Sequence, residues 1–239
     1  MRKYIAECVG TMLLTLIACG IAVTSNVDLV ATSLAFGLVI VAAAYSIGNV
    51  SGCHINPAVS IALTVAGKMD VKECIRYIIA QIIGAFVGSL LLALCLRGKF
   101  DALGANTIQD YLKTGGKLDA WSYISAFLVE VVLTMIFVFA IIGVTDSKFG
   151  NGKLGGIVIG ATLVLVHLLG LKLTGTSVNP ARSLAPAALN ATAGRTESIQ
   201  QIWIWVCAPL AGGALAAVLY GVLFPKKEQN LEETKEAQE

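Results

Sequence analysis

Two copies of the triplet Asn-Pro-Ala have the residue types and spacing to do a specific chemistry: Asn56-Pro57-Ala58 and Asn179-Pro180-Ala181. Asparagine is a preferred helix N-cap and proline suits the first helical position, so each triplet predicts a helix start. Apolar runs follow at 59–65 and 184–189, and they predict helices of about ten residues. Such a helix is about 15 Å long, half the thickness of a hydrocarbon core of about 30 Å.

If both helices begin at the middle of a membrane, their N-termini face each other, each with roughly half a positive charge. Two positive helix ends at the centre of a pore repel protons and cations. Each asparagine oxygen caps its own helix, so the NH2 groups of Asn56 and Asn179 can face the lumen and donate to one water. A water held in this way accepts poorly from its neighbours, which interrupts a proton wire. A purely capping role is the alternative, but it does not explain two caps at the centre of a membrane.

The composition places these triplets in a membrane protein. The chain has 239 residues, of which 56% are hydrophobic and 13% are charged, whereas soluble domains have about 25% charged residues. The net charge of +2 is too small to indicate a nucleic-acid partner, and no basic cluster with interleaved aromatic residues is found. The six cysteines stand singly without CxxC spacing, so they predict neither a disulfide framework nor a metal site.

Six apolar segments are long enough to cross a membrane: 4–23, 29–47, 75–96, 121–144, 154–171 and 202–224. The first could be mistaken for a secretory signal, but Glu7 lies inside it and it has a counterpart later in the chain. We therefore expect no cleavage. Residues 97–119 are expected to be a loop between two halves, and residues 225–239 a charged cytoplasmic tail.

A constant offset indicates an internal repeat. Four pairs of residues stand 123 positions apart: Glu7 and Glu130, Thr11 and Thr134, Gly37 and Gly160, Asn56 and Asn179. Each copy holds three spans and one half-helix, and an odd number of spans inverts the second copy in the membrane. The sequence thus predicts an all-α membrane protein, with six transmembrane helices and two half-spanning helices in an inverted repeat. A single domain covers residues 1–224, with repeats at about 4–96 and 121–224.

The distribution of basic residues predicts the orientation. With both termini inside, the inner segments hold ten Lys and Arg residues and the outer segments six. This bias favours cytoplasmic termini. We expect a multi-pass protein of the cell membrane, because no segment indicates an organelle and the short loops are compatible with a prokaryotic plasma membrane.

The segments Ser51-Gly-x-His-x-Asn-Pro-Ala-Val59 and Thr176-Ser-x-Asn-Pro-Ala-Arg-Ser183 are highly specific motifs. With the inverted repeat, they make residues 4–224 similar to the major intrinsic protein family, the aquaporins and glycerol facilitators. The resemblance implies a passive channel without a cofactor and a homotetramer in the lipid membrane. It also makes Cys53 and His54 candidates for lining the pore.

The resemblance further implies a selectivity filter, because Phe36, His167, Thr176 and Arg182 match the positions of the family's outer constriction. Arg182 is a membrane-depth cation in the first turn of a half-helix, where the dipole disfavours it. Thr176 is expected to contribute mainly a backbone carbonyl. Taken alone, His167 and Phe36 would be interpreted as packing residues. The match of all four positions to the family's constriction favours the filter. This set resembles that of water-selective members, whereas glycerol-permeable ones typically have a small residue for the His and Asp at the place of Ser183.

Glu7 and Glu130 are buried charges in the expected spans. One interpretation makes them proton-relay carboxylates of a transporter. The other makes them acceptors for backbone N–H groups in the irregular loops before the half-helices, which lipid cannot satisfy. The resemblance and their symmetric positions favour the second, since a buried carboxylate without such donors would be very costly.

Two residues depart from the family's pattern. Cys53 replaces a small residue and is the repeat mate of Thr176, so we expect it near the lumen on the cytoplasmic side, where a mercurial would block the pore. Val206, three residues before Pro209, replaces an aromatic residue that is common in water channels.

The sequence as a whole predicts a passive water channel. A facilitator of glycerol or another small neutral solute is the alternative within the family, and a proton-coupled transporter that uses Glu7 and Glu130 is the alternative from a different class. We expect no enzyme activity, because no nucleophile–base pair or metal-ligand cluster is found. Small residues could allow close helix contacts: Gly84, Gly88 and Ser89.

Overall fold

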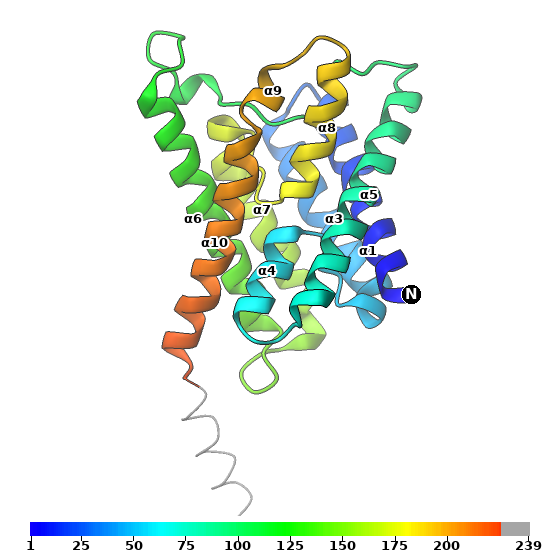
Figure 1. Cartoon of the computed structure of the whole chain (residues 1–239), viewed down its shortest axis with the longest axis vertical. Helices are drawn as coiled ribbons and strands as arrows, with labels where there is room; N and C mark the ends of the chain where they lie inside the picture. The colour runs from blue at the N-terminus through cyan, green and yellow to red at the C-terminus, as the bar shows by residue number, and fades with distance from the viewer. Residues whose placement is uncertain (226–239) are drawn as a thin grey trace, which may run out of the picture.

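Six long apolar helical segments form the body of the molecule, and they confirm the expected fold class. The computed structural model describes residues 1–225 (Figure 1), so the expected charged tail lies outside the described residues except for Pro225. Within residues 1–225 the long helices are α1 (Arg2–Leu13) continued by α2 (Gly20–Thr24), α3 (Leu29–Ser51), α5 (Val71–Cys95), α6 (Ala120–Val144), α7 (Gly155–Thr174) and α10 (Ile202–Leu223). Three short elements lie in the connections: η2 (Asp110–Leu112), η3 (Gly152–Leu154) and α9 (Glu197–Gln200).

Two shorter helices begin at the Asn-Pro-Ala triplets, as the sequence predicts. They are α4 (Pro57–Val65) and α8 (Pro180–Thr192), and each has proline in its first turn. Figure 1 shows them between the long helices, with their N-terminal ends directed at each other near mid-height. The second has 13 residues against nine for the first, and it continues beyond the expected end at residue 189.

The packing of the helices follows the repeat. α1 packs against α5 in the first copy and α6 against α10 in the second, while α3 and α7 contact each other between the copies. Each half-helix contacts the last span of the other copy, because α4 packs against α10 and α8 packs against α5. The two copies are therefore interlocked, and neither half-helix is positioned by its own repeat alone.

The first span contains a π-helical segment, η1 (Leu14–Cys19), between α1 and α2. The hydroxyl of Thr15 has one hydrogen to donate and lies within hydrogen-bonding distance of three carbonyls: those of Thr11 and Met12, at 3.1 and 3.2 Å, and that of Ala85 on α5, at 3.3 Å. Extra turns of this kind often occur at functional sites. No rule of helix periodicity predicts it from the sequence.

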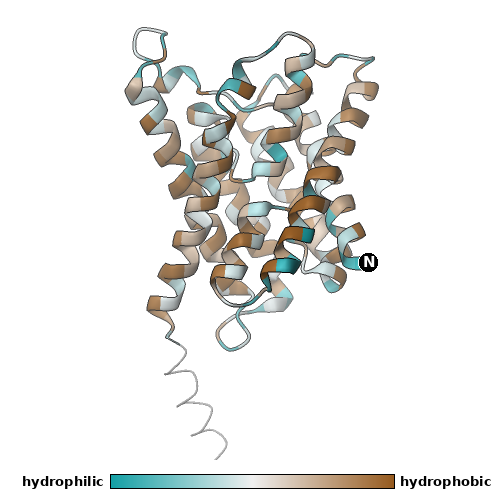
Figure 2. Cartoon of the chain, in the orientation of Figure 1, coloured by the Kyte–Doolittle hydropathy of each residue, from teal (hydrophilic) through white to brown (hydrophobic). Residues whose placement is uncertain are grey.

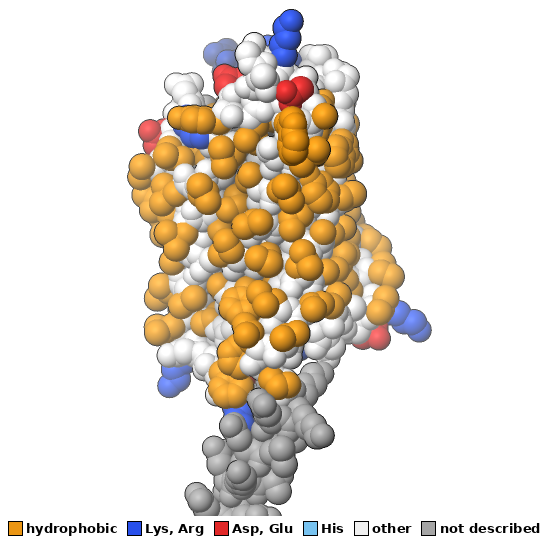
Figure 3. Space-filling view, turned by 90° about the vertical axis from the view of Figure 1, so that its left-hand side faces the viewer, with side chains coloured by type: hydrophobic (Ala, Val, Ile, Leu, Met, Phe, Trp, Pro, Cys, Tyr) orange, Lys and Arg blue, Asp and Glu red, His pale blue; other side chains and the backbone are white. Residues whose placement is uncertain are grey.

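The outer surface of the helices is apolar along most of its height. Figure 2 shows hydrophobic residues along the long helices and hydrophilic ones at their ends and in the loops. In Figure 3 the charged side chains of the visible face gather at the two ends of an apolar belt. This distribution is that of a multi-pass membrane protein.

The small residues that were expected to allow close helix contacts lie inside the chain. Gly84, Gly88 and Ser89 are buried on α5. An added Cβ on Gly84 would collide with the backbone of Cys8, and one on Gly88 with the backbone of Met12. They therefore bring α1 and α5 together within one subunit.

Close approach between α3 and α7 generates the first prediction. A Cβ on Gly37 would lie 2.5 Å from the carbonyl oxygen of Gly160, and a Cβ on Gly160 would lie 2.6 Å from that of Gly37. We expect Gly160→Ala to push the repeats apart and to destabilise the fold by about 1–3 kcal/mol. The measurement is the thermal unfolding temperature in detergent. Gly48→Ala on α3 is the control, since nothing lies within 4 Å of its added Cβ; equal unfolding temperatures for the two variants would contradict the prediction.

Candidate functional site

The loop before α4 is held by the carboxylate of Glu7, which is fully buried. One oxygen accepts from the hydroxyl of Ser51 at 2.7 Å and from the backbone N–H of His54 at 2.9 Å. The other accepts from the backbone N–H of Ile55 at 2.6 Å and from the amide of Gln81 at 2.7 Å. The carboxylate thus satisfies backbone donors that lipid could not satisfy.

Glu130 does the same for the loop before α8. Its oxygens accept from the hydroxyl of Thr174 at 2.7 Å and from the backbone N–H groups of Ser177 and Val178, both at 2.8 Å. The three donors stand 123 positions after Ser51, His54 and Ile55. The two loops therefore have the same hydrogen-bonding plan.

Both loops have a strained backbone. Positive φ angles occur at Cys53 (53°), Ile55 (40°), Thr176 (43°) and Val178 (45°). Such angles are unusual for any side chain and rare for β-branched ones, so the surrounding structure must hold them. The bonds from the neighbouring N–H groups to the two carboxylates provide that restraint.

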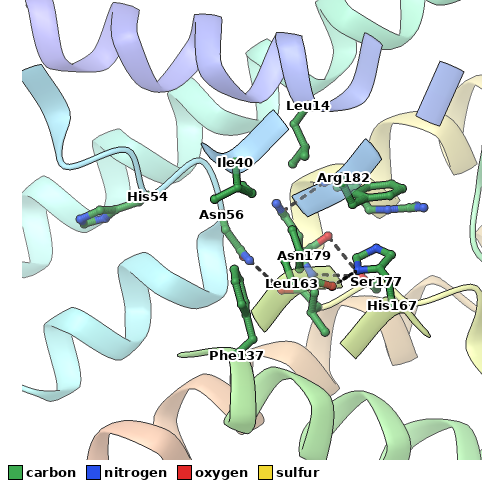
Figure 4. A pocket seen from close by; sticks show the side chains of 12 residues that line it. Leu14, Ile40, His54, Asn56, Phe137, Leu163, His167, Ser177, Asn179 and Arg182 are labelled. Carbon is green, nitrogen blue, oxygen red and sulfur yellow. Dashed lines mark hydrogen bonds between the residues drawn. The ribbon is translucent and has the colours of Figure 1, made fainter. Parts of the chain in front are cut away.

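The two triplets meet through their asparagines (Figure 4). The side-chain oxygen of Asn56 accepts from the N–H of Ala58 at 2.9 Å, and that of Asn179 accepts from the N–H of Ala181 at 3.1 Å. Each amide nitrogen then donates across to the other loop. Asn56 bonds the carbonyl of Val178 at 2.7 Å.

Asn179 makes the reciprocal bond to the carbonyl of Ile55 at 2.9 Å. The sequence predicted that the NH2 groups, each with two hydrogens, face the lumen. One of the two is used between the loops, because the carbonyls of Ile55 and Val178 lie within reach. An amide NH2 group has two hydrogens, so each asparagine keeps one further donor.

A small cavity of about 20 Å³ lies where the loops meet. A cavity of about 10–15 Å³ suffices for one water molecule, so this one has room for about one. Figure 4 shows the side chains around it, which come from both repeats. Its lining residues are Leu14, Phe36, Ile40, His54, Asn56, Phe137, Leu163, His167, Ser177, Val178, Asn179 and Arg182.

Three of the four expected filter residues lie together beside this cavity. The rings of Phe36 and His167 stack with centroids 4.3 Å apart, and the guanidinium carbon of Arg182 is 4.9 Å from the centroid of the Phe36 ring. Thr176 is fully buried outside the cavity lining. Its hydroxyl lies 2.5 Å from the place where a Cβ of Gly170 would be, so the side chain packs onto α7.

Hydrogen bonding orients the histidine. Nδ1 of His167 lies 2.9 Å from the carbonyl of Leu163. A carbonyl only accepts, so Nδ1 carries the proton, and Nε2 of the neutral ring is an acceptor. Among residues 1–225, neither Nε2 of His167 nor Nε of Arg182 has a hydrogen-bond partner. Within the described chain, the expected filter residues therefore have one acceptor and one donor free for a small polar molecule.

Asn106 is a site residue that sequence analysis missed. Its side-chain oxygen accepts from Nη1 of Arg182 and, at 2.7 Å, from the hydroxyl of Ser183. Its amide nitrogen donates to the carbonyl of Gly175 at 2.8 Å, and Arg182 also donates to the carbonyl of Gly104 at 3.0 Å. A single asparagine in a polar loop gives no sequence signal, although a membrane-depth arginine does require acceptors from somewhere.

Of the remaining candidates, His54 lines the central cavity, whereas Cys53 and Val206 lie outside its lining. Cys53 is half-buried and lines a second cavity of about 180 Å³ on the side of α4, and His54 lines both cavities. Val206 lies on an apolar groove between α5 and α10, beside Pro57 and Pro180. The residue that departs from the family's pattern there is thus outside the central cavity lining.

Comparisons with known proteins agree with this geometry. The family model "Major intrinsic protein" matches residues 1–220. The chain is 41% identical to Aquaporin Z of Rhodopseudomonas palustris over 234 residues, with 94% of each chain covered. It is 38% identical over 221 residues to "Glycerol uptake facilitator protein-like 6" of Lactiplantibacillus plantarum, with 91% of this chain and 95% of that protein covered. The fold is similar to the aquaglyceroporin structure from Plasmodium falciparum, with a TM-score of 0.84, 23% identity and 95% and 98% of the two chains covered.

The carboxylate bonds generate a prediction for Glu130→Gln. The substitution replaces an acceptor oxygen with an NH2 group, which cannot accept from Ser177 or Val178. A buried donor left unsatisfied costs about 1–3 kcal/mol, so we expect a lower unfolding temperature and a lower yield of folded protein. The exposed Asp101 provides the control, Asp101→Asn, which should behave like the native chain. A fully stable Glu130→Gln variant would show that the loop does not need the carboxylate.

Proposed function

The chain belongs to the major intrinsic protein family, and we propose that it is a passive channel selective for water. Membership makes it a multi-pass membrane channel rather than an enzyme. Membership does not decide between water and glycerol as the solute, because the relatives include an aquaporin and a protein named as a glycerol uptake facilitator-like protein.

The central cavity carries the proposal for water. Its volume of about 20 Å³ suits one water and not a three-carbon polyol. The stacked rings of Phe36 and His167 and the guanidinium of Arg182 contact one another and line the cavity together. A water replaces its lost neighbours by donating to Nε2 of His167 and accepting from Arg182. Size and hydrogen bonding thus favour the same solute.

Proton exclusion follows from the meeting of the two triplets. The N-termini of α4 and α8 face each other, and each contributes roughly half a positive charge. Asn56 and Asn179 each keep one N–H that can donate to a water oxygen. A water with two such donors is oriented so that it does not pass protons along the file, and the positive ends repel hydronium.

A glycerol facilitator is the second candidate. The relative named as a glycerol uptake facilitator-like protein favours it. Against it, Val206 lies outside the central cavity lining, and His167 occupies the position that a small residue fills in glycerol-permeable members. A proton-coupled transporter is less favoured, since the carboxylates of Glu7 and Glu130 are occupied by hydrogen-bond donors.

The surroundings of the channel are also part of the proposal. The bias of basic residues supports cytoplasmic termini and a location in the plasma membrane. Family membership supports a homotetramer with one pore in each subunit, and the apolar belt (Figure 3) supports contact with membrane lipid.

Stopped-flow light scattering on proteoliposomes tests the filter. We expect fast shrinkage of low activation energy under a sucrose gradient, and no re-swelling above that of bare liposomes with glycerol. The double variant His167→Gly, Arg182→Val should raise the glycerol flux by at least about tenfold, because it removes both the size limit and the polar match. Leu165→Ala, at an exposed position of α7, is the control. Rapid glycerol entry through the native protein would refute water selectivity.

Cys53 generates a separate prediction at the second cavity, on the side of α4. Its thiol lines a space of about 180 Å³ next to His54, so a mercury ion bound there obstructs the path. We expect mercuric chloride to block most of the water flow, and Cys53→Ser to remove the inhibition. Cys207→Ser is the matched control, since Cys207 is exposed on α10. Unchanged inhibition in Cys53→Ser would place the reactive thiol elsewhere.

A further inference from the structure

A basic pocket lies at the end of the molecule that carries the N-terminus. It has a volume of about 570 Å³ and lies between the starts of α1 and α5 and the segment after α4. Four basic side chains line it together with two carboxylates: Lys3, Lys68, Lys72, Arg76, Asp70 and Glu73. The lining therefore has an excess of positive charge.

The carboxylates of the pocket are already engaged. Glu73 forms an ion pair with Lys3 and accepts from the hydroxyl of Tyr4 at 2.8 Å. Asp70 caps α5 by accepting from the N–H groups of Lys72 and Glu73 at 2.8 and 3.4 Å. Glu73 is therefore paired with Lys3, whereas the charge of Asp70 remains available to one further cation of the pocket.

Among the described residues, two of the basic side chains form no ion pair, and the nearby charge of Asp70 acts on Arg76 but can offset only one of the two positive charges. Lys68 forms an ion pair with Asp146 at 3.3 Å. Arg76 donates to the neutral hydroxyl of Tyr4 at 3.3 Å. Within residues 1–225, neither Arg76 nor Lys72 forms an ion pair. Both side chains are exposed and stand four residues apart on one face of α5, so a single anion can reach both.

An apolar track leads away from these two cations along the same helix face. Ile79 and Ile83 follow Lys72 at i+7 and i+11, which places them above Lys72 and Arg76 on α5. They are 53% and 52% exposed. Their apolar surface faces the hydrocarbon region, and the basic pair lies at its edge. A free anion would not use this track, whereas a lipid would.

We propose that this pocket binds the phosphate of an anionic phospholipid, with an acyl chain lying along Ile79 and Ile83. Lys72 and Arg76 bind the phosphate, because a basic pocket at the rim of a membrane attracts anionic headgroups. Ser51, His54 and Tyr77 also line the pocket, which makes it continuous with the wall of the pore.

Contacts of the pocket residues with the loop before α4 would transmit the effect of a bound lipid to that loop. The hydroxyl of Tyr77 donates to the carbonyl of Ser51 at 2.8 Å, and the rings of Tyr77 and His54 lie 5.0 Å apart. His54 also lines the central cavity. A bound headgroup therefore stabilises the loop before α4, and it raises the unfolding temperature of the whole chain.

Native mass spectrometry of the full chain in detergent tests the proposal without measuring transport, so its failure would leave the water channel proposal untouched. Phosphatidylglycerol and phosphatidylcholine are compared at equal concentrations, with inorganic phosphate as a third probe. We expect phosphatidylglycerol to bind about tenfold more tightly than phosphatidylcholine and to raise the unfolding temperature. Equal binding of the two lipids would overturn the proposal, as would displacement of phosphatidylglycerol by millimolar phosphate, which would indicate a site for free anions.

Variants locate the site. Lys72→Gln, Arg76→Gln should lose about tenfold in phosphatidylglycerol binding, while the charge-conserving Lys72→Arg, Arg76→Lys should retain it. Lys99→Gln, Lys117→Gln is the matched control, because it removes two exposed charges away from the pocket. Should the first double variant fail to fold, Arg76→Gln alone gives the same comparison. Native-like binding in the Gln variants would overturn the proposal.

Discussion

Two segments of this chain enter the membrane and stop halfway, and their backbone N–H groups must find acceptors where there is no bulk water. A buried unpaired N–H group is costly in lipid. Glu7 and Glu130 remove that cost, because an ionised carboxylate only accepts and can take about four hydrogen bonds. The same N–H donors stabilise the buried negative charge. Each carboxylate therefore stabilises its loop and is stabilised by it. The candidate site depends on both of these carboxylate–loop contacts.

The geometry of the central cavity follows from this constraint. The carboxylates hold alternating positive φ angles in both loops, and the loops present the carbonyls of Ile55 and Val178 to the opposite asparagine. The two amide bonds join residues 122 and 124 positions apart. They hold the two helix N-termini against each other. Without these two hydrogen bonds the loops could move apart and the cavity could widen. The bonds therefore support a filter with room for about one water.

Much of this could be predicted from the sequence, because the repeat makes each landmark appear twice. The offset between Glu7 and Glu130 indicated both the inverted architecture and the symmetric support of the loops. Features that neither the repeat nor the family resemblance marks were not predictable. Asn106 has no periodic signal, and its contact with Arg182 depends on how a long loop folds back. The side-chain direction of Thr176 depends on the space beside Gly170, which only the packed structure defines.

The two cavities differ at positions that the repeat relates to each other. The residues 123 positions from Phe36, His167 and Arg182 are Ile159, Ala44 and Val59. All three of these line the second cavity beside α4, whose volume is about 180 Å³ against about 20 Å³ for the central cavity.

Positions related by the repeat thus carry only apolar side chains at the larger cavity, and a histidine and an arginine at the smaller one. Helix packing and carboxylate support are shared by both copies, so they cannot distinguish one solute from another. In the proposed water channel, discrimination would therefore depend on the few side chains that differ at the central cavity and on the loop that carries Asn106. Substitutions at Phe36, His167 or Arg182 therefore bear on the proposed selectivity, whereas substitutions at Glu7 or Glu130 bear on the hydrogen bonds that support the fold.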